Sequence, residues 1–152
     1  MLSPADPTVR AFLRHSMVAE AATLSPKLRP FVTPLWFVVH RDILYIAGAF
    51  DTWAGKNVAQ HPEVALLFSG ERAGRPHEIL RLRGTATRHR GLPSWRVLLR
   101  FALKYYVSPR ALPVELRHAR KWRLRALYYA RLKGGAGHIQ VVPGAGELLA
   151  RP

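Results

Sequence analysis

The amino-acid sequence predicts a mainly β fold with peripheral helices, formed by one domain of 152 residues. Residues 1–89 contain short apolar runs that prolines and charged turns interrupt, which is typical of β-strands. Within this half, residues 77–89 alternate clearly, with Leu80 and Leu82 on the face opposite most of the arginines and threonines. Residues 93–133 are strongly basic and predict helices.

The first half is expected to contain two helices among its strands. Pro7–His15 is predicted to be a short helix, because Asp6 can cap it and proline suits the first helical position. Residues 52–61 are predicted to form another helix, which Pro62 ends. Strands are expected at residues 17–24, 31–40, Ile43–Ala49, Glu63–Ser69 and 77–89, with a two-residue link at 41–42 and a polar loop at 71–76.

The second half is expected to consist of two basic helices and a closing strand. Ser94 is predicted to cap a helix that runs through residue 107, in which Arg96, Arg100 and Lys104 form one basic stripe. A second helix is expected over residues 113–133, ended by the glycines at 134–135. Residues 138–142 are expected to form the last short strand, so that the β part comprises 17–89 and 138–142 and the basic helical segment 93–133.

The composition restricts the chemistry of the protein. It has 24 Lys and Arg against 9 Asp and Glu, which gives a formal net charge of +15. Such a chain attracts anions, whether phosphorylated cofactors, nucleic acid or an anionic membrane surface. The absence of cysteine excludes disulfides, thiolate metal sites and a cysteine nucleophile. The seven histidines form no i, i+4 pair, and no G-x-S-x-G sequence is present, so neither a metal site nor a hydrolase triad is indicated.

The sequence gives no sign of membrane insertion or secretion. Its apolar runs are well short of the ~20 residues that a spanning helix needs. Residues 1–7 lack the basic start and apolar core of a secretory signal. We therefore expect a cytoplasmic protein.

The basic helices permit two interpretations. Their arginines and lysines alternate with aromatic residues, an arrangement that can bind nucleic acid or lie on an anionic membrane. Alternatively, the basic residues form a solvated helix face and the aromatic residues turn to the core. The aromatic residues concerned are Trp95, Tyr105, Tyr106, Trp122, Tyr128 and Tyr129.

Several segments, in order, resemble the pyridoxamine 5′-phosphate oxidase-like split barrels, a flavin-binding superfamily that also contains deazaflavin-dependent reductases and haem-degrading relatives. The likeness covers about residues 21–88 and 138–142. The similar segments are AATLS at 21–25, RPFVTPLWF at 29–37, LYIA at 44–47, NVAQHPEVAL at 57–66, RLRGTA at 81–86 and HIQV at 138–141.

The resemblance implies a six-stranded antiparallel Greek-key barrel that forms a homodimer, with FMN or a deazaflavin coenzyme at the dimer interface. The residues implied at the cofactor are Pro34, Leu35, Trp36, Ala47, Gly48 and Ala49 at the ring, and Thr52, Lys56 and Asn57 at the phosphate. Trp53 and Ala54 stand where the family typically has Arg and Lys, so other cations are needed there. Lys56, Arg81, Arg83 or a basic residue of the second half are the alternatives.

By this resemblance the protein is expected to be an oxidoreductase that transfers hydride between its cofactor and a small-molecule substrate. No side chain stands out as the catalytic acid or base; Tyr105, Tyr106 and His118 are possible proton donors. One alternative is a barrel without cofactor whose basic helices bind nucleic acid or a membrane surface. Another is a haem- or tetrapyrrole-binding relative with His40, His61 or His77 as ligand.

Overall fold

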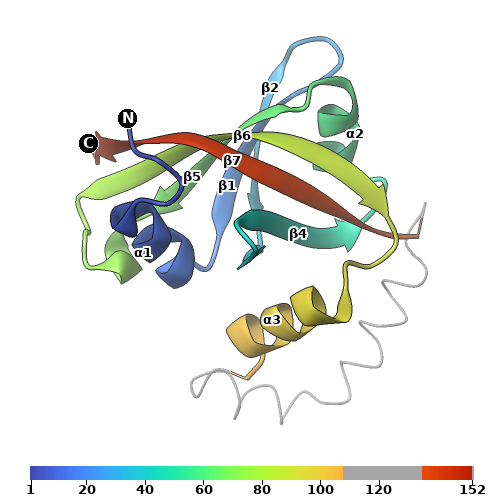
Figure 1. Ribbon diagram of the computed structural model, residues 1–152. Coiled ribbons are helices and arrows are strands. Elements are labelled where there is room, and N and C mark those ends of the chain that lie inside the picture. The colour runs from blue at the N-terminus through green and yellow to red at the C-terminus, as the bar shows by residue number, and fades with distance from the viewer. Residues whose placement is uncertain (108–134, 152) are drawn as a thin grey trace.

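A computed structural model describes residues 1–107 and 135–151 of the chain (Figure 1). The expected second basic helix, 113–133, lies outside these residues. The elements are α1 (Pro7–His15), β1 (Ala19–Leu24), β2 (Pro30–Leu35), β3 (Val38–His40), β4 (Ile43–Ala49), α2 (Trp53–Gln60), β5 (Glu63–Ser69), the 3₁₀ turn η1 (Glu71–Ala73), β6 (Glu78–Arg90), α3 (Trp95–Tyr105) and β7 (Ala136–Ala150).

The strands form one antiparallel sheet in the order β2-β1-β5-β6-β7-β4-β3. Its two outermost strands, β2 and β3, follow each other in the chain with only Trp36 and Phe37 between them. The sheet therefore has to curl until its edges meet, although no hydrogen-bonded pairing between β2 and β3 closes it. This mainly β architecture agrees with the expected split barrel, but it has seven described strands rather than six.

The additional strand arises because the expected strand at 31–40 is interrupted. The prediction of one continuous strand was wrong, since Trp36 and Phe37 leave the ladder. The backbone of Phe37 is satisfied by side chains of α3 instead. Its N–H donates to the Tyr105 hydroxyl at 2.9 Å, and its carbonyl accepts from the Lys104 ammonium at 3.1 Å. Long-range contacts that the local sequence does not reveal thus override a strong strand pattern.

The closing strand is much longer than expected. It was predicted to end at residue 142, but β7 continues to Ala150 and pairs with β6 along almost its whole length. Pro143 lies opposite Gly84, where the register between β6 and β7 shifts, and such a bulge tolerates a residue without an N–H group. A Cβ on Gly84 would lie 2.8 Å from the carbonyl oxygen of Val142, so the close approach requires glycine.

Most of the other expected elements of the first half are confirmed. Asp6 caps α1 through a hydrogen bond from the Thr8 amide at 2.8 Å. The link between β3 and β4 has φ values of 50° at Arg41 and 61° at Asp42. Two consecutive positive values are typical of the tight hairpin turns that suit the twist of strands, so the hairpin forms without the usual Asn-Gly pair. The expected polar loop at 71–76 contains the short η1 turn.

Two helices lie on the sheet at different places and create two cores. The main core contains α1 and the inward faces of the central strands, with Phe12, Phe68 and Leu80 fully buried. A smaller cluster forms where Val97, Phe101 and Tyr105 of α3 pack on β3. Figure 1 shows α1 and α3 as separate bodies beside the sheet, whereas α2 lies near the hairpin of β1 and β2. Ser94 precedes α3 as expected, but its side chain makes no capping hydrogen bond.

Among the described helices, none is both long and apolar enough to cross a membrane.

Candidate cofactor site

The turn from β4 into α2 forms the base of the candidate site. Thr52 caps α2, and its hydroxyl accepts a hydrogen bond from the Gly55 amide at 3.0 Å. A Cβ on Gly55 would approach the Phe50 carbonyl oxygen to 2.8 Å, so only glycine allows the chain to turn this tightly. The first amide groups of a helix lack partners within it, and they carry a partial positive charge. The start of α2 is therefore suited to an anionic group.

A cavity of about 70 Å³ lies between this turn and the adjoining strands. Four of the residues implied by the resemblance line it, namely Leu35, Ala47, Gly48 and Thr52. No atom lies within 4 Å of a Cβ built on Gly48, so that part of the wall is open. The remaining lining residues are Ile46, Phe50, Ala54, Gly55, Arg88, His89, Gly137, His138 and Ile139.

Pro34 and Trp36, which the resemblance also implies at the ring, are not among the residues that line this cavity. Pro34 is exposed on β2, and the backbone of Ala49 pairs with Ala136 of β7. Trp36 stacks on Tyr105 of α3, with ring centroids 4.5 Å apart and an angle of 5° between the ring planes. The structure therefore groups Leu35 with Ala47 and Gly48 and places Trp36 with α3.

The two other implied phosphate residues occupy different environments. Lys56 is exposed on α2, with its ammonium nitrogen 5.7 Å from the ring centroid of Trp53. Asn57 is fully buried, and its amide nitrogen donates to the Thr23 hydroxyl at 2.9 Å. The contact with Thr23 holds α2 against β1.

Arg88 is a cation of the site that the sequence analysis did not select. Its guanidinium carbon lies 4.2 Å from the Phe50 ring centroid, and that of Arg90 lies 4.1 Å from the same centroid. A nitrogen of Arg88 is 3.9 Å from the Asp51 carboxylate, which is too long for a strong ion pair. The alternation in β6 contained a signal, since Arg88 continues the inward row to which Leu82 belongs. Arg81, by contrast, pairs with Glu147.

Two imidazoles line the opposite wall of the cavity. His89 and His138 stack with ring centroids 5.0 Å apart. Nδ1 of His138 lies 2.9 Å from the Gly91 carbonyl oxygen. Because a carbonyl oxygen can only accept a hydrogen bond, Nδ1 must carry the proton. Nε2 then accepts from the Gln140 amide at 3.2 Å. Within the described residues, no group of three His, Asp or Glu is placed to hold a metal ion.

The lining fits one end of a phosphorylated ring system better than the whole of it. Pockets for such molecules usually measure about 300–1,000 Å³, well above the volume found here. The donors suit a phosphate, whereas Leu35 and Ala47 offer an apolar wall for an adjoining ring. The single chain therefore supplies only part of the space that such a molecule needs.

Tyr105, a possible proton donor in the sequence analysis, is committed to the fold. Its hydroxyl accepts from the Phe37 amide and lies 2.8 Å from the carbonyl oxygens of Met17 and Phe37. Burial raises the pKa of Tyr105 to about 12. A phenol so placed is a poor acid near neutral pH. Tyr106 contacts Trp36 edge to face, and His118 lies outside the described residues.

A curled antiparallel sheet, interrupted between β2 and β3 and with a capped helix after β4, defines a split barrel. The family model described as pyridoxamine 5′-phosphate oxidase matches residues 5–121, and the chain belongs to this family. No curated protein matches the sequence.

Solved structures confirm the fold. An F420 reductase is 19% identical, with a TM-score of 0.63 and coverage of 91% of this chain and 94% of that one. The heme storage protein HutZ from Vibrio cholerae is 12% identical, with a TM-score of 0.62 and coverage of 95% and 93%. A conserved hypothetical protein from Mycobacterium tuberculosis is 15% identical, with a TM-score of 0.66 and coverage of 95% and 84%. At these identities the likeness concerns the fold alone.

Proposed function

We propose that the protein is an oxidoreductase that binds a phosphorylated flavin or deazaflavin between two subunits and exchanges hydride with a small-molecule substrate. The observation that carries the proposal is the grouping of an apolar wall, a helix start and an arginine around one cavity. Leu35 and Ala47 come from separate strands, and Arg88 comes from a third. Membership of a family whose description names an oxidase supports the same reading.

The phosphate end of the cofactor is assigned to the start of α2. Thr52 and the first amides of α2 supply neutral donors there, and Arg88 supplies a charge. Lys56 lies in the same short helix and can add a second charge from the exposed side. Each charge-assisted contact contributes about 1.5–3 kcal/mol. Arg88 thus compensates for the cations that the family typically has at positions 53 and 54.

The second subunit is assigned to the outer face of β2. No residue of β2 is buried in the single chain, although Phe31 and Val32 are large and apolar. The Phe31 ring also stacks on Trp53, with centroids 6.2 Å apart, and Trp53 is 69% exposed. We assign the partner to this apolar surface because Leu35, in the same strand, lines the cavity, so that a partner seated there would enclose the ring. FMN and a deazaflavin coenzyme share the ring shape and phosphate that the site requires.

The bound cofactor supplies the hydride chemistry, and the protein orients it and excludes water. Leu35, Ala47 and Gly48 form the wall against which a flat ring can lie. Gly91 and Gln140 engage both ring nitrogens of His138, so its imidazole is held in a fixed orientation beside that wall.

Cofactor titration with matched arginine variants tests the proposal. We expect FMN or a deazaflavin coenzyme to bind at micromolar concentration. Arg88→Met and Lys56→Ala should each raise the dissociation constant about ten-fold or more, roughly 1.4 kcal/mol. Arg83, an alternative cation in the sequence analysis, lies on the opposite face of β6 from Arg88 and does not line the cavity, so Arg83→Met is the control and should leave the dissociation constant unchanged. If the wild type and the three variants bind the cofactor with equal affinity, Arg88 and Lys56 do not hold its phosphate.

The same titration separates the alternatives. If haem binds and neither flavin does, the tetrapyrrole alternative replaces the proposal. His40, His61 and His77 are spread over β3, the end of α2 and the turn before β6, so single alanine variants would identify the ligand. If no cofactor binds while salt-sensitive binding to nucleic acid or anionic vesicles persists, the basic segment carries the function.

A further inference from the structure

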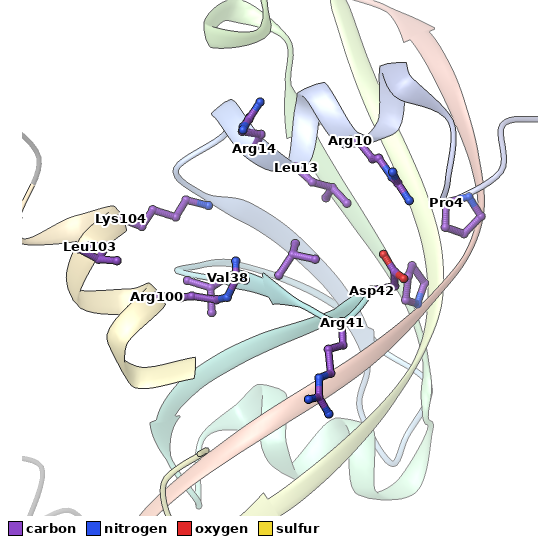
Figure 2. Close-up of a pocket in the computed structure, with 12 residues that line it drawn as sticks. Pro4, Arg10, Leu13, Arg14, Val38, Arg41, Asp42, Arg100, Leu103 and Lys104 are labelled. Carbon is purple, nitrogen blue, oxygen red and sulfur yellow. The ribbon is translucent and has the colours of Figure 1, made fainter. Parts of the chain in front are cut away.

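A second and larger cavity lies between α1 and α3, beside the hairpin of β3 and β4. It measures about 580 Å³, within the range of small-molecule sites. Figure 2 shows Arg10, Leu13 and Arg14 of α1 on one side and residues of α3 on the other, with Val38 between them. It shares no lining residue with the candidate cofactor site.

The lining of this cavity is strongly cationic. Five of its side chains are basic and one is acidic, and they come from both helices and the hairpin turn. Within residues 1–107 and 135–151, none of the five forms an ion pair, whereas four other arginines of the chain do. The basic residues are Arg10, Arg14, Arg41, Arg100 and Lys104, and the acid is Asp42. The described part of the chain therefore leaves this excess of positive charge without a neutralising carboxylate.

Burial disfavours the charge on Lys104, and the neighbouring arginines act on His40. Its ammonium nitrogen lies 3.7 Å from the Phe37 ring centroid, and burial lowers the pKa of Lys104 to about 8. Nearby, Nδ1 of His40 is buried without a partner, and the pKa of His40 is lowered by burial and then by Arg100, Arg41 and Arg96. An anion in the cavity would relieve this unfavourable concentration of charge.

The rest of the lining is apolar, which indicates an organic ligand rather than an inorganic ion. Leu13, Val38 and Leu103 approach the cavity from three different elements, and two prolines and Val39 complete it. A ligand that fills this space needs an apolar body in addition to its charge. Asp42 restricts the anionic group to the part of the cavity near α3, because like charges repel.

We propose that the cavity between α1 and α3 binds an amphipathic organic anion, a molecule with an apolar ring or chain and one acidic group. Arg100 and Lys104 hold the acidic group, and Leu13, Val38 and Leu103 contact the apolar body. The site is distinct from the candidate cofactor site and stands whether or not a flavin binds there.

The test uses a pair of probes that share one aromatic framework and differ by a single sulfonate group. 8-Anilinonaphthalene-1-sulfonate is an apolar anion that fluoresces in apolar surroundings, and N-phenyl-1-naphthylamine is its uncharged counterpart. Arg100→Met removes one charge from the lining. Arg96→Met is the matched control, because Arg96 is equally exposed one turn earlier on α3 and does not line the cavity. Both substitutions lie on the surface, and unfolding curves verify that the fold persists.

We expect Arg100→Met to raise the dissociation constant of the sulfonate about ten-fold and to leave that of the neutral probe unchanged. Arg96→Met should change neither. Arg10→Met, on the α1 side of the cavity, should also raise the dissociation constant of the sulfonate. The proposal is overturned if the wild type shows no saturable sulfonate binding, or if Arg100→Met and Arg96→Met behave alike.

Discussion

The hydroxyl of Tyr105 accepts a hydrogen bond from the backbone amide of Phe37 at 2.9 Å, and this contact stabilises the interruption between β2 and β3. The interruption separates the two cavities, since Leu35 before it lines the candidate cofactor site and Val38 after it lines the cationic cavity. Tyr105, together with Lys104, whose ammonium donates to the Phe37 carbonyl, thus holds the backbone between two candidate binding sites.

Replacing Tyr105 with phenylalanine should destabilise the protein by about 1–3 kcal/mol, because the buried amide of Phe37 loses its partner. Urea unfolding measures the change. Tyr45→Phe is the control, since the Tyr45 hydroxyl makes no hydrogen bond within the described part of the chain, and it should have little effect. Equal stabilities of the two variants would show that the Tyr105 hydroxyl does not hold the interruption.

Lys104 should make stability depend on pH. Burial lowers its pKa from 10.5 in the unfolded chain to about 8 in the folded one. Between these values the unfolded chain holds more protons, so unfolding takes up a proton and the contribution of Lys104 to stability rises with pH. The free energy of unfolding of the wild type relative to Lys104→Met should therefore increase from pH 8 to pH 10. A difference that stays constant over this range contradicts the shift.

Replacing Asn57 should lower the stability of the protein and leave its affinity for the cofactor unchanged. Its buried amide bonds Thr23, so Asn57→Ala should cost about 1–3 kcal/mol in unfolding free energy. The affinity for FMN, measured well below the unfolding temperature, should stay near that of the wild type. If the affinity falls while the stability is unchanged, Asn57 contacts the cofactor as the family resemblance implies.

The exposed side of β2 should control assembly. Val32 is 61% exposed, and an arginine there places a charge in the surface assigned to the partner subunit. Val32→Arg should convert a dimer into a monomer in sedimentation velocity experiments and abolish cofactor binding as well. Arg29→Lys, an exposed position just before the strand, is expected to do neither. A wild-type monomer that binds cofactor would refute the shared site.

Local sequence signals predicted most of the first half correctly. The cap at Asp6 and the alternation in β6 predicted α1 and the buried row of β6, because each depends on residues close in the chain. Leu35, Ala47 and Gly48, which the family resemblance implies at the ring, line one cavity, and their role in cofactor binding stays a prediction. Features of this kind can be predicted because the period of a helix or a strand decides which residues of a short segment lie together.

The features that escaped prediction depend on contacts between distant residues. The interruption after Leu35 is created by α3, some seventy residues later in the chain. Pro143 continues a strand only because Gly84 leaves room for it across the sheet. The alternation in β6 places Arg88 in the same row as Leu82, but the curl of the sheet, which brings this row to Thr52 and Ala47, depends on contacts between distant residues.

The absorption spectrum of the purified protein, with mass spectrometry of any released ligand, tests the central claim most directly. A flavin or deazaflavin spectrum, and a released molecule that carries a phosphorylated tricyclic ring, is the result expected. A haem spectrum contradicts the claim, as does a colourless protein that takes up neither FMN nor a deazaflavin coenzyme at micromolar concentration.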